Sequence, residues 1–184
     1  MPNITEVRWH GRGGQGAITA AKIFGQAAFD SGFAGVVMAP SFGTERRGAP
    51  VEVSLKIAKS KINDLCPIEE PHVVVVLDHS ILDEIDVTAG MKPGGTVVIN
   101  TPRSRDEYDF SDFKVATANV TELAEAAGLK RGIVNTGVIG ALIKVLPLVP
   151  FDALLKAIEA EFAGKKGAEN AEAARRTHEH TATE

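Results

Sequence analysis

The segment from His10 to Gly16, which reads HGRGGQG, constrains the fold of this chain more than any other. It follows a short alternating apolar run, 4–9, and precedes an alanine-rich stretch of helical spacing, 17–29. A strand, a glycine-rich turn and a helix in this order form the element that many α/β proteins use to hold phosphates, because glycine adopts positive φ and lets a ligand approach the backbone. The helix start adds unpaired N–H groups and the positive end of its dipole. We therefore expect a ligand-binding turn within an α/β fold.

Further strand patterns follow along the chain. Residues 73–77 (VVVVL) are apolar at every position, which is typical of a central parallel strand covered on both faces. Residues 51–57 alternate apolar and polar, which predicts a half-exposed strand near a sheet edge. Three more short strands are expected, and these are 35–39, 96–99 and 114–117. The pattern predicts a Rossmann-like, doubly wound α/β fold with a mostly parallel sheet and a helical C-terminal third.

Two helices are expected after the last of these strands. Asn119 and Thr121 compete to cap the first, over 122–127, and Gly128 would end it. The apolar face of residues 138–146 predicts the second.

The remainder of the chain is also expected to be helical. Apolar residues repeat at helical spacing over 151–162. Residues 169–180 are charged and alanine-rich with almost no apolar face, so we expect either a solvated helix or a frayed tail there. The length predicts a single domain over 1–184, with a core over 1–164 and a helical tail over 165–184.

Composition argues against several classes of function. The net charge of −4 gives no basic surface to favour nucleic acid or an anionic membrane. No apolar run approaches the roughly 20 residues of a membrane span, and residues 1–6 lack the basic start and apolar core of a secretory signal. The one cysteine, Cys66, permits neither an internal disulfide nor a CxxC metal site. We expect a cytoplasmic protein in which Cys66 is a small buried or half-buried side chain.

The loop after the second expected strand carries the next functional signal. That strand ends at Pro40 without the Asp or Glu that binds ribose hydroxyls in a dinucleotide site, which argues against NAD. The loop over 41–50 instead holds Arg46 and Arg47, whose planar guanidinium groups bind phosphate well. A loop here, beside the glycine turn, lies where open α/β sheets bind ligands. The alternative is that Glu45 and the arginines form only a surface ion pair.

Other residues near these loops favour structural roles. His10, beside the glycine turn, is expected to be a hydrogen-bonding residue rather than a catalytic one. Asp78, which precedes His79 at the end of a strand, is expected to cap a short helix. Small residues at helical spacing predict a helix that lies close on the sheet, and these are Ala17, Ala21, Gly25 and Ala28.

Three segments together resemble the gamma subunit of the 2-oxoacid:ferredoxin oxidoreductases. They are RWHGRGGQG (8–16), FGTERRGAPV (42–51) and IVNTGVIGA (133–141). The likeness runs over nearly the whole chain, and the ERRGAP sequence is similar to the pyruvate branch, pyruvate synthase. The resemblance implies a subunit of an enzyme that oxidatively decarboxylates a 2-oxoacid, with pyruvate favoured, to acyl-coenzyme A and CO2 while reducing ferredoxin.

The resemblance also implies partners and cofactors. Alpha, beta and delta-type subunits would hold thiamine diphosphate, magnesium and [4Fe-4S] clusters, since one cysteine cannot ligate a four-cysteine cluster. The whole assembly could form a dimer, and this chain alone would bind no cofactor and be inactive.

In this family the gamma subunit helps to shape the active site and the access of coenzyme A, the co-substrate. The implied cofactor-binding residues are Gly11, Arg12, Gly13, Gly14, Gln15, Gly16, Ser41, Glu45, Arg46, Arg47, Gly48 and Asn135, and no catalytic or metal-binding residue is assigned. Two alternatives stay open. One is an NADP-dependent Rossmann oxidoreductase whose arginines read the 2′-phosphate, and the other is a purely architectural subunit.

Overall fold

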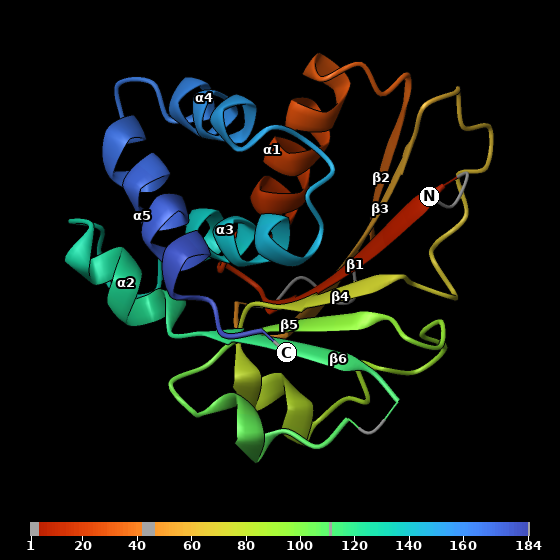
Figure 1. Cartoon of the computed structure of the whole chain (residues 1–184), viewed down its shortest axis with the longest axis horizontal. Coiled ribbons are helices and arrows are strands. Elements are labelled where there is room, and N and C mark those ends of the chain that lie inside the picture. The colour runs from red at the N-terminus through yellow and green to blue at the C-terminus, as the bar shows by residue number, and fades with distance from the viewer. Residues whose placement is uncertain (1–3, 42–46, 111, 184) are drawn as a thin grey trace.

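The computed structural model describes residues 4–41, 47–110 and 112–183, and it contains a six-stranded sheet (Figure 1). The strand order is β2-β3-β1-β4-β5-β6. The strands are β1 (Thr5–Arg12), β2 (Gly35–Ser41), β3 (Pro50–Ala58), β4 (Val73–Val76), β5 (Thr96–Asn100) and β6 (Lys114–Ala118). Strands β1, β4, β5 and β6 pair in parallel, whereas β3 pairs antiparallel with both β1 and β2. Because β3 alone runs against the other described strands, the predicted α/β fold with a mostly parallel sheet is confirmed.

The helices divide between the two faces of the sheet. The α-helices are α1 (Ala17–Asp30), α2 (Val120–Ala126), α3 (Asn135–Val145), α4 (Phe151–Glu161) and α5 (Gly167–His180). Figure 1 shows α1, α3, α4 and α5 together on one face. On the opposite face, the described helical cover is two short 3₁₀ helices, η1 (His79–Asp83) and η2 (Arg105–Glu107). The predicted helical C-terminal third is confirmed.

Strand β4 separates two hydrophobic clusters. Val73 and Val75 pack into the cluster under the α-helices, whereas Val74 and Val76 pack on the other side with Ile81 of η1. Each of the four valines is at most 5% exposed. The predicted central strand covered on both faces is confirmed, because side chains of alternate residues point to opposite faces of a sheet.

Residues 51–57 form a strand as predicted, but the prediction that this strand is half-exposed is wrong. β3 lies one strand in from the edge, and its residues from Val53 to Ala58 are all buried. The polar side chains of β3 have partners in the loop that follows the strand. Ser54 Oγ accepts a hydrogen bond from the N–H of Ile68 at 3.0 Å, and Lys56 Nζ pairs with Asp64. The loop that follows β3 folds back over these polar side chains, which is why a polar face can be buried.

The prediction that residues 169–180 form a solvated or frayed segment is also wrong. α5 packs against α2, α3 and α4, and its buried residues are Asn170, Ala171, Ala173, Ala174 and Thr177. The contact with α3 is close at Gly140, where a Cβ atom would collide with the backbone of Ala174. Small side chains on both helices therefore replace the large apolar face that a buried helix ordinarily shows.

Helix α1 lies close on the sheet, as its small residues predict. Ala17, Ala21, Gly25 and Ala28 are all buried. A Cβ at Gly25 would lie 3.0 Å from Val36 Cγ1 of β2, so the helix could not approach β2 as closely with a larger residue there. This packing fixes the N-terminus of α1 at the carboxyl end of β1.

Helix α2 has one of the two N-caps that the sequence predicts. Asn119 is the N-cap of α2, and its side chain accepts a hydrogen bond from the N–H of Glu122 at 3.3 Å. Gly128, with φ of 92°, follows the end of that helix. Of the two candidate caps, Asn119 is therefore the one that serves.

Candidate functional site

The glycine turn joins β1 to α1. Gly14 has φ of 95° and Gly16 has φ of 80°, so both occupy backbone conformations that residues with a Cβ rarely adopt. Gly16 is the N-cap of α1, and no side chain caps the helix there. The predicted strand, turn and helix with positive φ are confirmed.

Hydrogen bonds within the protein already use several of the backbone N–H groups of the segment 11–16, which the sequence offers as donors to a ligand. The N–H of Arg12 donates to Gln15 Oε1 at 2.7 Å, that of Gly13 to the Ala49 carbonyl at 2.8 Å, and that of Gln15 to the Arg12 carbonyl at 3.0 Å. Gly11 lies within β1, paired with Val51. The N–H groups of Gly14 and Gly16 donate to no described residue, so the set of open donors narrows to these two and the first turn of α1.

The Arg12 side chain is bound within the protein. Its Nη2 donates to Glu84 Oε1 at 2.6 Å and to Ser80 Oγ at 2.9 Å, and its Nε lies 3.5 Å from Asp78 Oδ2. The hydrogen bond with Glu84 raises the pKa of Arg12. Through its guanidinium group, Arg12 therefore links the glycine turn to η1.

Gln15 makes a second link between the same elements. Its Nε2 donates to Asp78 Oδ2 at 2.8 Å, while Asp78 Oδ1 accepts from the Ser80 N–H at 3.0 Å. Burial alone would raise the pKa of Asp78, but the hydrogen bonds from Ser80 and Gln15 hold it below its ordinary value. The predicted capping role of Asp78 is confirmed, and Gln15 joins the ends of β1 and β4.

The loop between β2 and β3 returns directly onto the glycine turn. The N–H of Gly48 donates to the Gly13 carbonyl at 3.1 Å, beside the bond from Gly13 to Ala49. A Cβ at Gly14 would lie 3.8 Å from Arg47 Cγ, so the Arg47 side chain lies over the turn. Ser41 is exposed at the end of β2, whereas Glu45 and Arg46 lie outside the described residues.

Asn135 approaches the turn from α3. It is 8% exposed, and a Cβ at Gly16 would lie 3.0 Å from both its Cβ and its Nδ2. Its Oδ1 is buried and has no hydrogen-bond partner in the described part of the chain. Buried acceptors without partners are costly. The structure therefore brings Gly14, Gly16, Arg47 and Asn135 together, as the sequence predicts.

His10 is buried next to the turn and bonded to a residue that sequence reasoning missed. Its Nε2 accepts from Arg8 Nε at 3.2 Å, and Arg8 Nη2 donates to the carbonyls of Val87 and Ala89 at 2.9 and 2.7 Å. Burial, with a further contribution from the Arg8 charge, lowers the pKa of His10 to about 4. His10 is thus a neutral hydrogen-bonding residue, as predicted. The sequence did contain a signal for this pairing, because Arg8 and His10 are two residues apart and their side chains therefore lie on the same face of β1.

The low pKa of His10 predicts a pH dependence of stability. The pKa is about 4 in the folded chain and about 6.5 in the unfolded chain. Because the unfolded state binds the proton more readily, the stabilisation is complete above about pH 6.5 and is lost as the pH falls towards 4, by about 3 kcal/mol in total. Urea unfolding between these pH values should show a shallower pH dependence for His10→Gln than for the wild type. His180→Gln, at an exposed position, is the control, and equal slopes for all three proteins would contradict the prediction.

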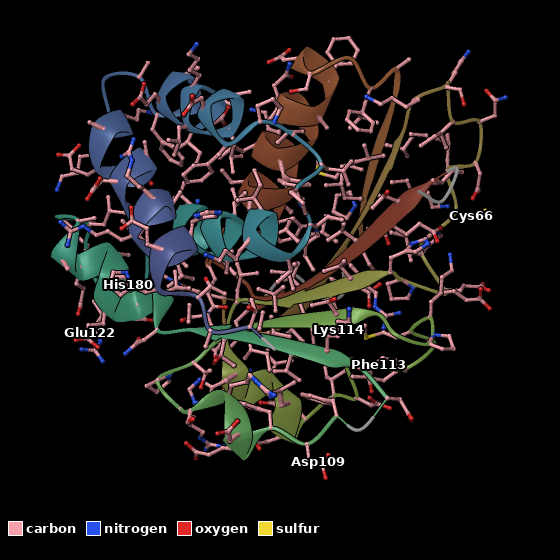
Figure 2. All side chains as sticks on the ribbon, in the orientation of Figure 1. Cys66, Asp109, Phe113, Lys114, Glu122 and His180 are labelled. Atoms are coloured by element: carbon pink, nitrogen blue, oxygen red, sulfur yellow. The ribbon has the colours of Figure 1, made fainter. Side chains whose placement is uncertain are left out.

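Cys66 differs from its prediction. It is exposed on the loop between β3 and β4, rather than buried or half-buried, and Figure 2 shows it on the opposite side of the molecule from His180. Among the described residues, no group of three or more His, Cys, Asp or Glu side chains is placed to hold a metal ion. No helix in the described ranges is long and apolar enough to cross a membrane.

Comparison with known proteins identifies relatives over the whole fold. The sequence profile described as pyruvate ferredoxin/flavodoxin oxidoreductase matches residues 6–180. The common gamma subunit of the pyruvate/ketoisovalerate oxidoreductases of Pyrococcus furiosus is 46% identical over 183 residues, which is 97% of each chain. The pyruvate synthase subunit PorC of Methanothermobacter thermautotrophicus is 44% identical, covering 96% of this chain and 95% of the relative.

Solved structures agree. The crystal structure of the pyruvate oxidoreductase subunit PORC from Thermotoga maritima superposes with a TM-score of 0.84 at 32% identity, over 98% of both chains. A 2-oxoglutarate:ferredoxin oxidoreductase from Magnetococcus marinus has the same fold in 32% of a longer chain, with a TM-score of 0.75 and 19% identity. The resemblance expected from the three sequence segments is confirmed.

Proposed function

This chain belongs to the pyruvate ferredoxin/flavodoxin oxidoreductase family as a gamma subunit, and we propose that within the assembled enzyme it shapes the active site and the access of coenzyme A. The reaction we propose is oxidative decarboxylation of a 2-oxoacid, with pyruvate as substrate, to acyl-coenzyme A and CO2 with reduction of ferredoxin. The Pyrococcus relative is named for both pyruvate and ketoisovalerate, and the Methanothermobacter relative for pyruvate.

One observation carries the proposal: the hairpin loop between β2 and β3 is bonded to the glycine turn. The bonds between Gly13 and the segment Gly48–Ala49 hold Arg47 beside Gly14, whose N–H group is open. A guanidinium group and a helix N-terminus both stabilise negative charge. This arrangement fits the phosphate groups of coenzyme A, and the orphaned Asn135 Oδ1 beside Gly16 offers one further polar contact.

The remaining chemistry belongs to partner subunits in this proposal. Thiamine diphosphate with magnesium would supply the chemistry of decarboxylation there, and [4Fe-4S] clusters would supply electron transfer to ferredoxin. A single cysteine cannot provide the four thiolates of such a cluster. We therefore place these groups on alpha, beta and delta-type subunits of a cytoplasmic complex, which could dimerise as a whole. The gamma chain, proposed as one domain over 1–184, would be inactive when purified alone.

Replacing Arg46 and Arg47 with alanine in the assembled enzyme should weaken the apparent affinity for coenzyme A. Loss of one charge-assisted bond to phosphate costs about 1.5–3 kcal/mol, which corresponds to roughly a 10- to 150-fold increase in KM. The KM for the oxoacid should change little, because the defect is confined to coenzyme A binding. Arg→Lys should restore the affinity only partly, since a point charge does not reproduce the planar fork.

Arg175→Ala is the matched control, because Arg175 lies on α5 and pairs locally with Glu172. The phosphate role fails if the double variant keeps the wild-type dependence on coenzyme A in a correctly assembled complex. A double variant that no longer assembles would place the loop in a subunit interface, which contradicts the phosphate role and favours the architectural alternative.

A further inference from the structure

A polar hollow lies away from the glycine turn, at the carboxyl ends of β5 and β6. Its volume is about 400 Å³, and it is lined by residues 101–106, residues 117–119 and the C-terminal residues His180, Ala182 and Thr183. Figure 2 shows His180 at the left of the molecule, well away from Lys114, which begins β6. Open α/β sheets bind ligands at the carboxyl ends of their parallel strands. We call this hollow the β5–β6 pocket.

The β5–β6 pocket concentrates positive charge in a chain whose net charge is −4. Its lining contains two guanidinium groups, those of Arg103 and Arg105, against one carboxylate, that of Asp106. The Arg103 side chain forms no hydrogen bond or ion pair with any described residue. Within the same residues, the Arg105 side chain has only a loose contact with the 87% exposed Asp106, at 3.8 Å. Both guanidinium groups are therefore available to a ligand, unlike that of Arg12.

The loop that carries the two arginines is ordered by its own hydrogen bonds. Thr101, which is 1% exposed, accepts bonds through Oγ1 from the Tyr108 hydroxyl at 2.6 Å and from the Arg103 N–H at 3.0 Å. The N–H of Ser104 donates to Glu107 Oε1 at 2.9 Å as part of a capping box. These bonds hold the backbone on both sides of the arginines, and fixing a site before binding reduces the entropy lost on binding.

The C-terminal segment forms the opposite wall of the pocket. Ala182 pairs with Thr117 in an antiparallel bridge along β6. His180 Nδ1 is bonded to the Arg176 carbonyl at 2.9 Å, which leaves Nε2 as the other polar atom of the ring. The nearby Glu122 is itself bonded to Asn119 Nδ2 at 2.8 Å.

We propose that the β5–β6 pocket binds a phosphate group, held by the guanidinium groups of Arg103 and Arg105. Planar guanidinium groups match phosphate oxygens in a bidentate manner. The group could be free phosphate or a phosphate of coenzyme A, since both pocket and glycine turn lie at the same edge of the sheet. Strands β5 and β6 lie two and three places from β1 in the sheet, and neighbouring strands are roughly 5 Å apart. A ligand that reached both the glycine turn and the β5–β6 pocket would therefore extend over roughly 10–15 Å.

Titration of the full-length chain with inorganic pyrophosphate at constant ionic strength tests the proposal by calorimetry. We expect saturable binding that weakens at least about tenfold in Arg103→Ala and in Arg105→Ala, in keeping with the loss of one charge-assisted bond. Arg131→Ala is the matched control, because Arg131 is 81% exposed on the loop before α3 and should leave binding unchanged. Thermal unfolding should be the same for all these proteins, since neither pocket arginine makes a close internal contact.

The two sources of the phosphate are separated in the assembled enzyme with coenzyme A and with its analogue that lacks the 3′-phosphate. If Arg103→Ala raises the KM for coenzyme A and not for the analogue, the pocket holds the 3′-phosphate. If it weakens pyrophosphate binding and leaves both KM values unchanged, the pocket holds a free phosphate. Absence of saturable pyrophosphate binding, or wild-type binding by both pocket variants, would overturn the proposal. So would binding lost in Arg47→Ala but kept in Arg103→Ala, which would place the phosphate at the glycine turn.

Discussion

Gly140→Ala should lower the free energy of unfolding by about 3 kcal/mol, or roughly 6–12 °C in Tm for a chain of this size. Helix propensity alone predicts the opposite sign, because alanine is favoured over glycine in a helix by about 1 kcal/mol. The new Cβ would collide with the backbone of Ala174 on α5, and a backbone cannot move aside as a side chain can. The helices would have to separate, which loosens the packing of the last helix. Thermal unfolding followed by circular dichroism measures the change.

Lys144→Ala provides the control for this experiment, because Lys144 is exposed on the same helix. Its effect should stay within about 0.5 kcal/mol. A stabilised Gly140→Ala protein would show that α3 and α5 do not pack as described.

Gly16→Val should reduce turnover of the assembled enzyme by about 100-fold or more, with secondary structure largely kept. Valine tolerates a φ of 80° poorly, and its Cβ would lie 3.0 Å from Asn135. The start of α1 and Asn135 would therefore shift relative to Arg47, and displacements of about 1 Å at a ligand site can cost roughly 100-fold in rate. Gly14→Val, at a φ of 95°, should act in the same direction. Steady-state kinetics with saturating oxoacid measures both.

Gly32→Val separates backbone strain from loss of the site. Gly32 has a comparable φ of 89°, lies beyond the other end of α1, and has nothing within 4 Å of its would-be Cβ. Some stability should be lost, with normal turnover in the folded fraction. Unchanged turnover in both Gly14→Val and Gly16→Val would mean that the turn is only a connector.

Sequence patterns predicted correctly those parts of the fold that depend on residues close to one another in the chain. Strand β4 is apolar throughout, and the glycine turn has its strand before it and its helix after it. Both follow from side-chain periodicity and from the conformational freedom of glycine. Asn119 and Asp78 cap the elements that follow them, again through contacts within a few residues.

The errors arose where distant residues decide the environment. Lys56 and Ser54 look like the exposed face of a strand until residues 64–68 fold over them. α5 lacks large apolar residues, so its burial depends on Gly140 in another helix, which a hydrophobicity pattern does not reveal. The antiparallel direction of β3 was likewise not predicted.

For the candidate site, the sequence predicted which residues come together but not which partners bind their side chains. Gly14, Gly16, Arg47 and Asn135 meet at one end of the sheet, as the motifs suggest. The partner of the Arg12 guanidinium group, Glu84, lies 72 residues further along the chain. Pairings over such separations are set by the strand order, which the motif does not contain.

The antiparallel placement of β3 has a consequence for how such a site can diversify. In an ordinary β–α–β unit, the residues after a strand lead into a helix that must dock on the sheet, so a change of length there disturbs packing. Here β2 and β3 form an antiparallel hairpin, and the described residues at its tip, 47–49, lead directly into β3 rather than into a helix. The bonds of Gly48 and Ala49 to Gly13 anchor one of its ends. Residues could be inserted or exchanged at this tip without reshaping the scaffold, which lets one framework accept different ligands through changes in a single short segment.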